Sequence, residues 1–210
     1  MIIKRIKEKG ILAKLLEKGI KILLYKECKK IGKIKIDIIA SSIEIIRGVI
    51  EKIYINAEEV NYKELLIDKI ELESDEVKIA FKINNNDFNF KNNFTIKFKI
   101  SLSENSIKKI LLSSIWDWIW DIISNELLNQ AKLEDIKIKN NLIFVKSIKQ
   151  NSSNFELEKL ELKAEIGKIY VSNENHAKSI VIPIEDKVYI KSLNVNNNSI
   201  IIEGNSSISF

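Results

Sequence analysis

Alternation of apolar and charged residues is the feature that most restricts the fold of this chain. In run after run between residues 32 and 102 an apolar side chain returns at every second position, as in Lys33-Ile34-Lys35-Ile36-Asp37. Successive side chains of a β-strand point to opposite faces, so this pattern gives each strand one buried and one wet face. Strands of this kind are typical of antiparallel sheets. We therefore expect a first antiparallel meander over residues 32–102.

The same pattern returns in the last third of the chain. Asparagine clusters such as Asn140-Asn141 and Asn196-Asn197-Asn198 separate the runs, and asparagine tolerates the left-handed backbone of tight turns. Pro183, the only proline, cannot donate to a strand ladder and so marks an edge strand or a bulge. The sequence predicts a second meander over residues 134–210.

Residues 103–131 interrupt the alternation with helical periodicity. Ser103 suits an N-cap and Glu104 suits the first turn. The apolar side chains cover nearly twice the roughly 100° that a surface helix buries. Asp117 and Asp121 interrupt the roughly 20 apolar residues that a membrane span requires. We expect an α+β fold in which a strongly curved antiparallel sheet wraps around one long central helix at residues 103–131.

Residues 1–27 read as a basic amphipathic helix, because apolar residues recur at helical spacing with lysines between them. Such a helix either packs on the sheet or lies at a membrane interface and attracts anionic lipid, and the two roles are compatible. The candidate membrane-surface residues are Lys4, Arg5, Lys7, Lys14 and Lys18.

Length and charge limit the remaining possibilities. The 210 residues contain no linker rich in proline or glycine, so we expect a single domain over residues 1–210. The net charge of +5 comes from 34 bases mixed with 29 acids, whereas nucleic-acid binders concentrate positive charge on one face; nucleic acid is therefore not an expected partner. Cys28 is the only cysteine, and no signal segment is evident, which favours a cytoplasmic and possibly peripheral membrane protein of open oligomeric state.

Catalytic and metal-binding signatures are missing from the sequence. His176, the only histidine, lies in a polar stretch without a nucleophile motif, and one histidine with one cysteine cannot form a structural zinc site. Asp117 and Asp121 lie one helical turn apart and could pair as acid and base, although a solvated stripe is the favoured interpretation. We expect no enzyme activity, no cofactor and no metal.

The aromatic residues suggest where a ligand could bind. Trp116 and Trp120 are expected to stack on one face of the central helix, opposite phenylalanines on the apolar faces of the strands. Two interpretations stay open, a solid core or an apolar cavity that lipid chains fill. The candidate lining residues are Ile115, Trp116, Ile119, Trp120, Ile123, Phe81, Phe94 and Phe98.

Three segments resemble the LmeA-type phospholipid-binding family, a bacterial and cyanobacterial domain: the run 34–57, the run 67–77 and the junction Leu102-Ser103-Glu104. The similarity spans residues 10–150, but Val49 follows Gly48 where the family commonly has proline. The resemblance implies a tubular lipid-binding type of fold and binding of phospholipid or another amphiphile.

Two functional hypotheses follow from the sequence. The first is binding of phospholipid or another amphiphile in an apolar groove between the curved sheet and the helix, at a membrane surface. The alternative is a structural or scaffold protein with a solid core that docks a partner through its basic N-terminal helix. A lipid hydrolase using His176 is a third and weaker hypothesis.

Overall fold

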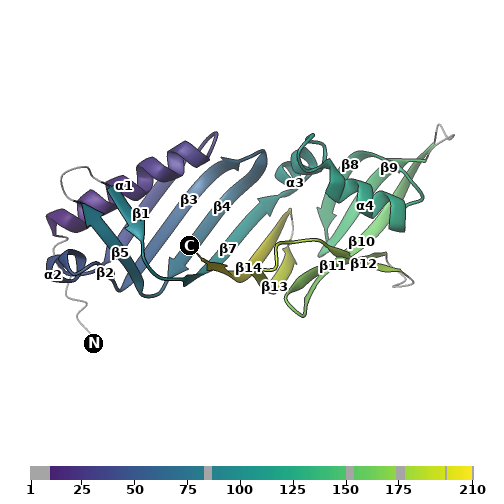
Figure 1. Ribbon diagram of the computed structural model, residues 1–210. Coiled ribbons are helices and arrows are strands. Elements are labelled where there is room, and N and C mark those ends of the chain that lie inside the picture. Colours follow the sequence, from purple (N-terminus) through teal and green to yellow (C-terminus); the bar gives the residue numbers. More distant parts are fainter. Residues whose placement is uncertain (1–9, 83–86, 150–153, 174–177, 197, 210) are drawn as a thin grey trace, which may run out of the picture.

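A computed structural model describes residues 10–82, 87–149, 154–173, 178–196 and 198–209, although the side chains of residues 81–88 are not described (Figure 1). Its strands form three antiparallel sheets of six, five and three strands, accompanied by short helices. The α+β class dominated by antiparallel sheets is thus confirmed. The strands do not form the single sheet wrapped around a helix that the sequence analysis predicts, because the alternating runs separate into these three sheets.

The six-stranded sheet forms the middle of the molecule (Figure 1). In spatial order its strands are β1 (Lys33–Ile39), β3 (Lys52–Tyr62), β4 (Leu65–Ser74), β7 (Phe94–Ser103), β14 (Ser199–Ile208) and β13 (Val188–Asn196). The last two strands belong to the C-terminal hairpin, in which Ile200 pairs with Leu102 of β7. The second meander predicted over residues 134–210 is therefore divided, because its last hairpin extends the six-stranded sheet.

One end of the six-stranded sheet is covered by α1 (Ile11–Glu27), α2 (Ser42–Ile46) and a three-stranded sheet of β2 (Val49–Ile50), β5 (Val77–Lys82) and β6 (Asp87–Phe90). Ala13, Leu16 and Ile20 of α1 are buried in the core that these elements share with the sheet. The predicted amphipathic helix is thus present from residue 11, and the earlier part of the prediction lies outside the described residues.

The opposite end of the molecule contains the five-stranded sheet and two helices (Figure 1). Its strands are β8 (Lys132–Lys139), β9 (Leu142–Ile148), β10 (Phe155–Glu165), β11 (Lys168–Asn173) and β12 (Ser179–Ile182). β12 is an edge strand that ends directly before Pro183, as the sequence predicts. The inward side chains of this sheet pack against the helices in a second core that includes Trp120 and Ile123.

The predicted long central helix is wrong, because residues 103–131 form two helices, α3 (Glu104–Leu111) and α4 (Asp117–Leu127). Between them the backbone N–H of Trp116 is shared by the carbonyl and the hydroxyl of Ser113, at 3.1 and 3.3 Å. Serine competes in this way with helical hydrogen bonding. The wide apolar face is therefore divided between two short helices, each of which buries its own side.

The sequence analysis also misses α2, which interrupts the predicted first meander. Ser41 and Glu44 form a capping box, in which the Ser41 hydroxyl accepts the N–H of Glu44 at 3.2 Å and the Glu44 carboxylate accepts the N–H of Ser41 at 2.5 Å. This exchange satisfies two backbone donors that a short helix would otherwise leave unpaired. Ile45 points into the first core, whereas Ile43 and Ile46 point out.

Candidate functional site

The predicted groove residues lie in different parts of the structure. Trp120 and Ile123 belong to the second core, together with the partly buried Ile119. Phe94 packs against the first core, where its ring lies 5.1 Å from that of Phe90. Phe98 packs over Gly204 in the middle of the six-stranded sheet, and the side chain of Phe81 lies outside the described part. The structure therefore does not bring these residues together in one groove beside α4.

Trp120 is a core residue with a satisfied polar group. Its side chain is 7% exposed, and its Nε1 donates a hydrogen bond to the carbonyl oxygen of Ala131 at 3.2 Å. The hydroxyl of Ser124 donates to the same oxygen at 2.7 Å. Since buried polar groups must be paired, these two bonds fix the end of α4 against the start of β8.

Trp116 is half-buried and does not stack on Trp120 as predicted, because it is the non-helical N-cap of α4 whereas Trp120 lies within the helix. Its ring lies 6.4 Å from the ring of Trp118, and its Nε1 donates to the carbonyl oxygen of Lys63 at 2.8 Å. Lys63 belongs to the turn between β3 and β4. Trp116 therefore joins the α3–α4 connection to that turn, and Ile115 beside it is 49% exposed.

A hollow of about 790 Å³ lies on the charged face of the six-stranded sheet, opposite the packed cores. Its side chains stand in two registered rows across the strands, because Glu71 pairs with Lys99 and Glu73 pairs with Lys97. Lys99 forms an ion pair with Glu203 at 2.7 Å, and this contact raises the pKa of Lys99 and lowers the pKa of Glu203.

The other acids near this hollow are engaged in the same way. Lys97 contacts both Glu73 and Asp75, at 3.7 and 3.2 Å, and the hydrogen bonds from Lys97 and Lys52 lower the pKa of Asp75. Lys69 pairs with Glu71 at 2.5 Å. These acids thus pair with lysines of their own strand or of neighbouring strands. In the described part of the chain, no three metal-ligating side chains gather into a cluster.

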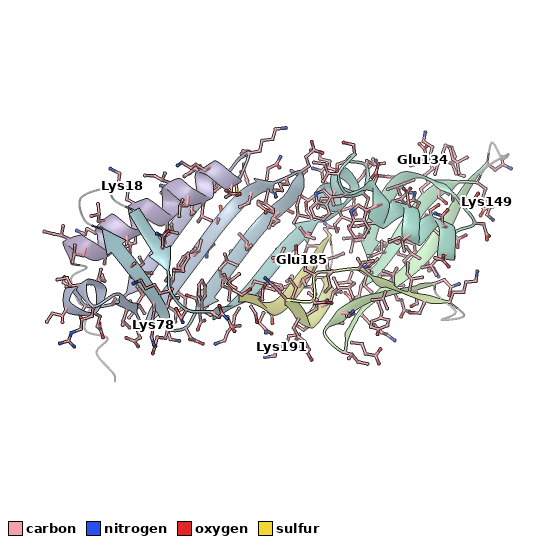
Figure 2. All side chains as sticks on the ribbon, in the orientation of Figure 1. Lys18, Lys78, Glu134, Lys149, Glu185 and Lys191 are labelled. Atoms are coloured by element: carbon pink, nitrogen blue, oxygen red, sulfur yellow. The ribbon has the colours of Figure 1, made fainter. Side chains whose placement is uncertain are left out.

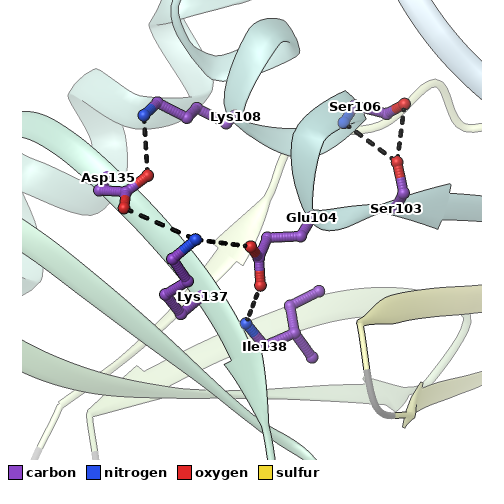
Figure 3. Close-up of polar contacts among 7 residues, drawn as sticks. All are labelled: Ser103, Glu104, Ser106, Lys108, Asp135, Lys137 and Ile138. Carbon is purple, nitrogen blue, oxygen red and sulfur yellow. Dashed lines mark hydrogen bonds and ion pairs between the residues drawn. The ribbon is translucent and has the colours of Figure 1, made fainter.

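A second polar network joins α3 to β8 (Figure 3). The Glu104 carboxylate accepts the N–H of Ile138 at 2.7 Å and pairs with Lys137 at 3.1 Å. Lys108 pairs with Asp135 at 2.7 Å, and this hydrogen bond lowers the pKa of Asp135. Each carboxylate is occupied by donors, so the network holds two elements together.

The outer face of α1 is different, because lysines predominate on it: of the two acids of α1, Glu17 lies at its edge, three residues after Lys14, and Glu27 lies outside it. Lys14, Lys18, Lys21 and Lys26 are exposed, while Glu17 accepts the N–H of Ile38 at 3.2 Å. Lys18 is labelled on α1 in Figure 2. Lys14 and Lys18, two of the predicted membrane-surface residues, are thus exposed on α1. Lys4, Arg5 and Lys7 lie outside the described residues. We call this surface the basic face of α1; it consists of Ile11, Lys14, Lys18, Lys21, Ile22, Tyr25 and Lys26.

The apolar members of the basic face are unusually exposed for a helix that packs on a sheet. Ile11, Ile22 and Tyr25 are 85%, 49% and 44% exposed. At about 100° per residue they fall between the lysines, opposite the buried Leu16 and Ile20. Sequence periodicity suggested an apolar face for α1 but did not separate the isoleucines that pack inward from those that point to solvent.

The remaining sequence candidates give no catalytic arrangement. Asp117 and Asp121 are both exposed on α4, and His176 lies outside the described residues. No helix of the described chain is long and apolar enough to cross a membrane. Comparison of the chain with models of protein families, with curated proteins and with solved structures gave no match.

Proposed function

We propose that this protein binds anionic phospholipid at a membrane surface through the basic face of α1. The observation that carries the proposal is the composition of this face, in which four exposed lysines alternate with exposed isoleucine and tyrosine. Helices that lie in a membrane interface combine basic and apolar residues in this way. Its resemblance to the LmeA-type phospholipid-binding family agrees with the proposal and remains a prediction.

Binding to a membrane costs less free energy when the helix is already folded in the free protein. Residues such as Leu16 and Ile20 anchor α1 in the first core, so binding to lipid does not require the helix to form first. Each basic residue close to an anionic leaflet contributes about 1 kcal/mol of attraction. Lysine stems can lie along apolar acyl chains while the ammonium groups stay at the headgroups, and the tyrosine ring suits the same depth.

Charge on the six-stranded sheet is balanced, which distinguishes that sheet from the basic face. On the six-stranded sheet Lys35, Lys69, Lys97 and Lys99 each form an ion pair with an acid of the sheet. Such a surface is nearly neutral to an approaching membrane. We therefore expect the protein to approach an anionic surface with α1 foremost.

Vesicle co-sedimentation tests this proposal. The variant Lys14→Glu/Lys18→Glu/Lys21→Glu should bind vesicles of phosphatidylcholine and phosphatidylglycerol at least about 100-fold more weakly than the wild type, since three attractive charges become repulsive. The matched control is Lys139→Glu/Lys163→Glu/Lys168→Glu, which makes the same change in net charge on exposed lysines of the five-stranded sheet. Equal loss in both variants would show that only net charge matters and would contradict the proposal.

An amphiphile on the apolar face of the six-stranded sheet is a second candidate function. Leu72, Ile96 and Phe98 are half-buried and belong to none of the three hydrophobic clusters of the described residues. An acyl chain laid along them would bury apolar area that the fold leaves open. Native mass spectrometry of the purified protein should then detect a bound amphiphile, and Phe98→Ser should lower its occupancy; a single mass equal to that of the chain contradicts this candidate.

A scaffold that docks a protein partner through α1 is the alternative, and the packed second core around Trp120 favours it over a hollow lipid carrier. The two functions separate in one comparison. If the protein is a scaffold, the triple α1 variant loses capture of the partner, and neither the wild type nor the variant binds pure vesicles. If it is a membrane-binding module, the wild type binds pure vesicles and the variant loses this binding.

A further inference from the structure

We infer that the end of the molecule formed by α2 and the first residue of α1 inserts into the acyl region of the membrane. This inference rests on the proposed function and names a second, apolar contact beside the electrostatic one. The three isoleucines involved, Ile11, Ile43 and Ile46, are 85%, 63% and 70% exposed and are called the isoleucine tip below.

The members of the isoleucine tip belong to two elements that pack against each other, α1 and α2. Ile43 and Ile46 are three residues apart in α2 and so share its outer side, while Ile45 between them is 1% exposed and anchors the helix in the first core. The start of α1 lies against α2, because a Cβ added at Gly10 would meet the Ser42 hydroxyl at 2.6 Å. Ile11 follows Gly10 as the first residue of α1, and α1 and α2 lie at the same end of the molecule (Figure 1).

The backbone N–H groups at the two ends of α2 are hydrogen-bonded within the protein, which suits an apolar environment. The capping box of Ser41 and Glu44 satisfies two N–H groups at the start of α2, and the N–H of Arg47 donates to the carbonyl of Ile43 at 3.0 Å. Glu44 is turned into this cap, so the acid of α2 does not face outward. A short helix can enter lipid only when its polar backbone groups are paired within the protein.

Charge complementarity selects an anionic membrane as the occupant. Arg47 ends α2 and is exposed, and the basic face of α1 begins with Lys14 one turn after Ile11. Apolar side chains ringed by basic ones match the acyl region and the headgroups of an anionic leaflet. The lysines give a salt-dependent attraction and the isoleucines a salt-resistant one, because screening weakens only the interaction between charges.

Salt dependence separates the two contacts in one experiment. Binding to vesicles of phosphatidylcholine and phosphatidylglycerol is measured at low and high sodium chloride for the wild type, for Ile43→Ser/Ile46→Ser and for the lysine triple variant. At high salt, where apolar burial dominates the binding energy, the tip variant should bind vesicles about tenfold or more weakly than the wild type. The control Phe155→Ser/Leu157→Ser removes two apolar side chains that are 54% and 67% exposed on the five-stranded sheet, and it should bind as the wild type does.

An environment-sensitive fluorophore gives a direct readout. Because Cys28 is the only cysteine, Cys28→Ser/Ile46→Cys accepts one label at the tip, and Cys28→Ser/Leu157→Cys accepts one at the control surface. Vesicles should shift the tip label to the blue and leave the control label unchanged. The inference is overturned if the emission of the tip label does not shift. It is also overturned if the emission shifts with protein concentration in the absence of vesicles, because that shift reports contact with a second copy.

The binding experiment separates the two proposals. If only the lysine variant loses binding, insertion is wrong and the proposed function stands; if only the tip variant loses binding, the electrostatic proposal is wrong.

Discussion

The carboxylate of Glu104 accepts a hydrogen bond from the backbone N–H of Ile138, 2.7 Å away and 34 residues further along the chain. Glu104 opens α3 at the end of the six-stranded sheet, and Ile138 lies in β8 of the five-stranded sheet. Lys137 pairs with the second oxygen of the same carboxylate (Figure 3). One side chain therefore ties α3, which follows the six-stranded sheet, to the five-stranded sheet.

Replacing Glu104 should destabilise the protein through the N–H that it leaves unpaired. We expect Glu104→Ala to lower the free energy of unfolding by about 1–3 kcal/mol, since an unsatisfied buried donor costs that much. Glu104→Gln keeps an acceptor for the Ile138 N–H and should cost less. Urea unfolding followed by tryptophan fluorescence measures both. Glu134→Ala, which breaks only a surface pair with Lys132, should cost under about 0.5 kcal/mol and serves as the control.

Acid should weaken the fold through Asp135. The hydrogen bond from Lys108 holds the pKa of Asp135 below its usual value, so the folded state binds this proton less readily than the unfolded state. The contribution of Asp135 is then fully present above the unfolded pKa of about 4 and is lost as pH falls through the lower folded pKa. Unfolding curves at pH 7, 4 and 3 should show a smaller loss of stability in Asp135→Asn than in the wild type. The exposed Asp121→Asn should follow the wild type.

Two glycine-to-alanine substitutions should have opposite effects on the stability of the protein. Gly48 has a φ of +76°, and a Cβ there would lie 2.2 Å from the carbonyl oxygen of Ile79, so Gly48→Ala should lower stability by at least about 1–3 kcal/mol. Gly19 lies inside α1, where alanine should raise stability by about 0.5–1 kcal/mol. Thermal unfolding checks both. A neutral Gly48→Ala would mean that the turn before β2 relaxes without cost.

Truncation of Trp120 and of Ile115, which the sequence analysis places in the same groove, should change the free energy of unfolding by different amounts. Trp120→Ala should cost about 3–5 kcal/mol because the ring is buried in the second core. Ile115→Ala should change stability by under about 0.5 kcal/mol because that side chain is 49% exposed. Unfolding by urea, followed by circular dichroism, measures both without relying on the tryptophan signal. Similar costs at the two positions would contradict the division of the predicted helix.

Local patterns in the sequence were sufficient for the strands and for α1. Alternation such as that of Lys33 to Asp37 predicts a strand with one buried face. The spacing of Ala13, Leu16 and Ile20 predicts a helix with one buried face. The lysines of α1 could be named as membrane candidates for the same reason, since the spacing of a helix assigns residues to faces. These properties depend on neighbours only a few residues apart.

The tertiary structure decided the rest. Whether Ile200 would pair with Leu102 depends on two segments about 100 residues apart, and no local pattern encodes that choice. The break at Ser113 divides one apparent apolar face into two, so Trp120 is buried while Ile115 is exposed. Which isoleucines of α1 and α2 remain in solvent is likewise settled by the area available on the sheet. Periodicity fixes the direction of a side chain relative to its own element, and only packing determines what lies opposite it.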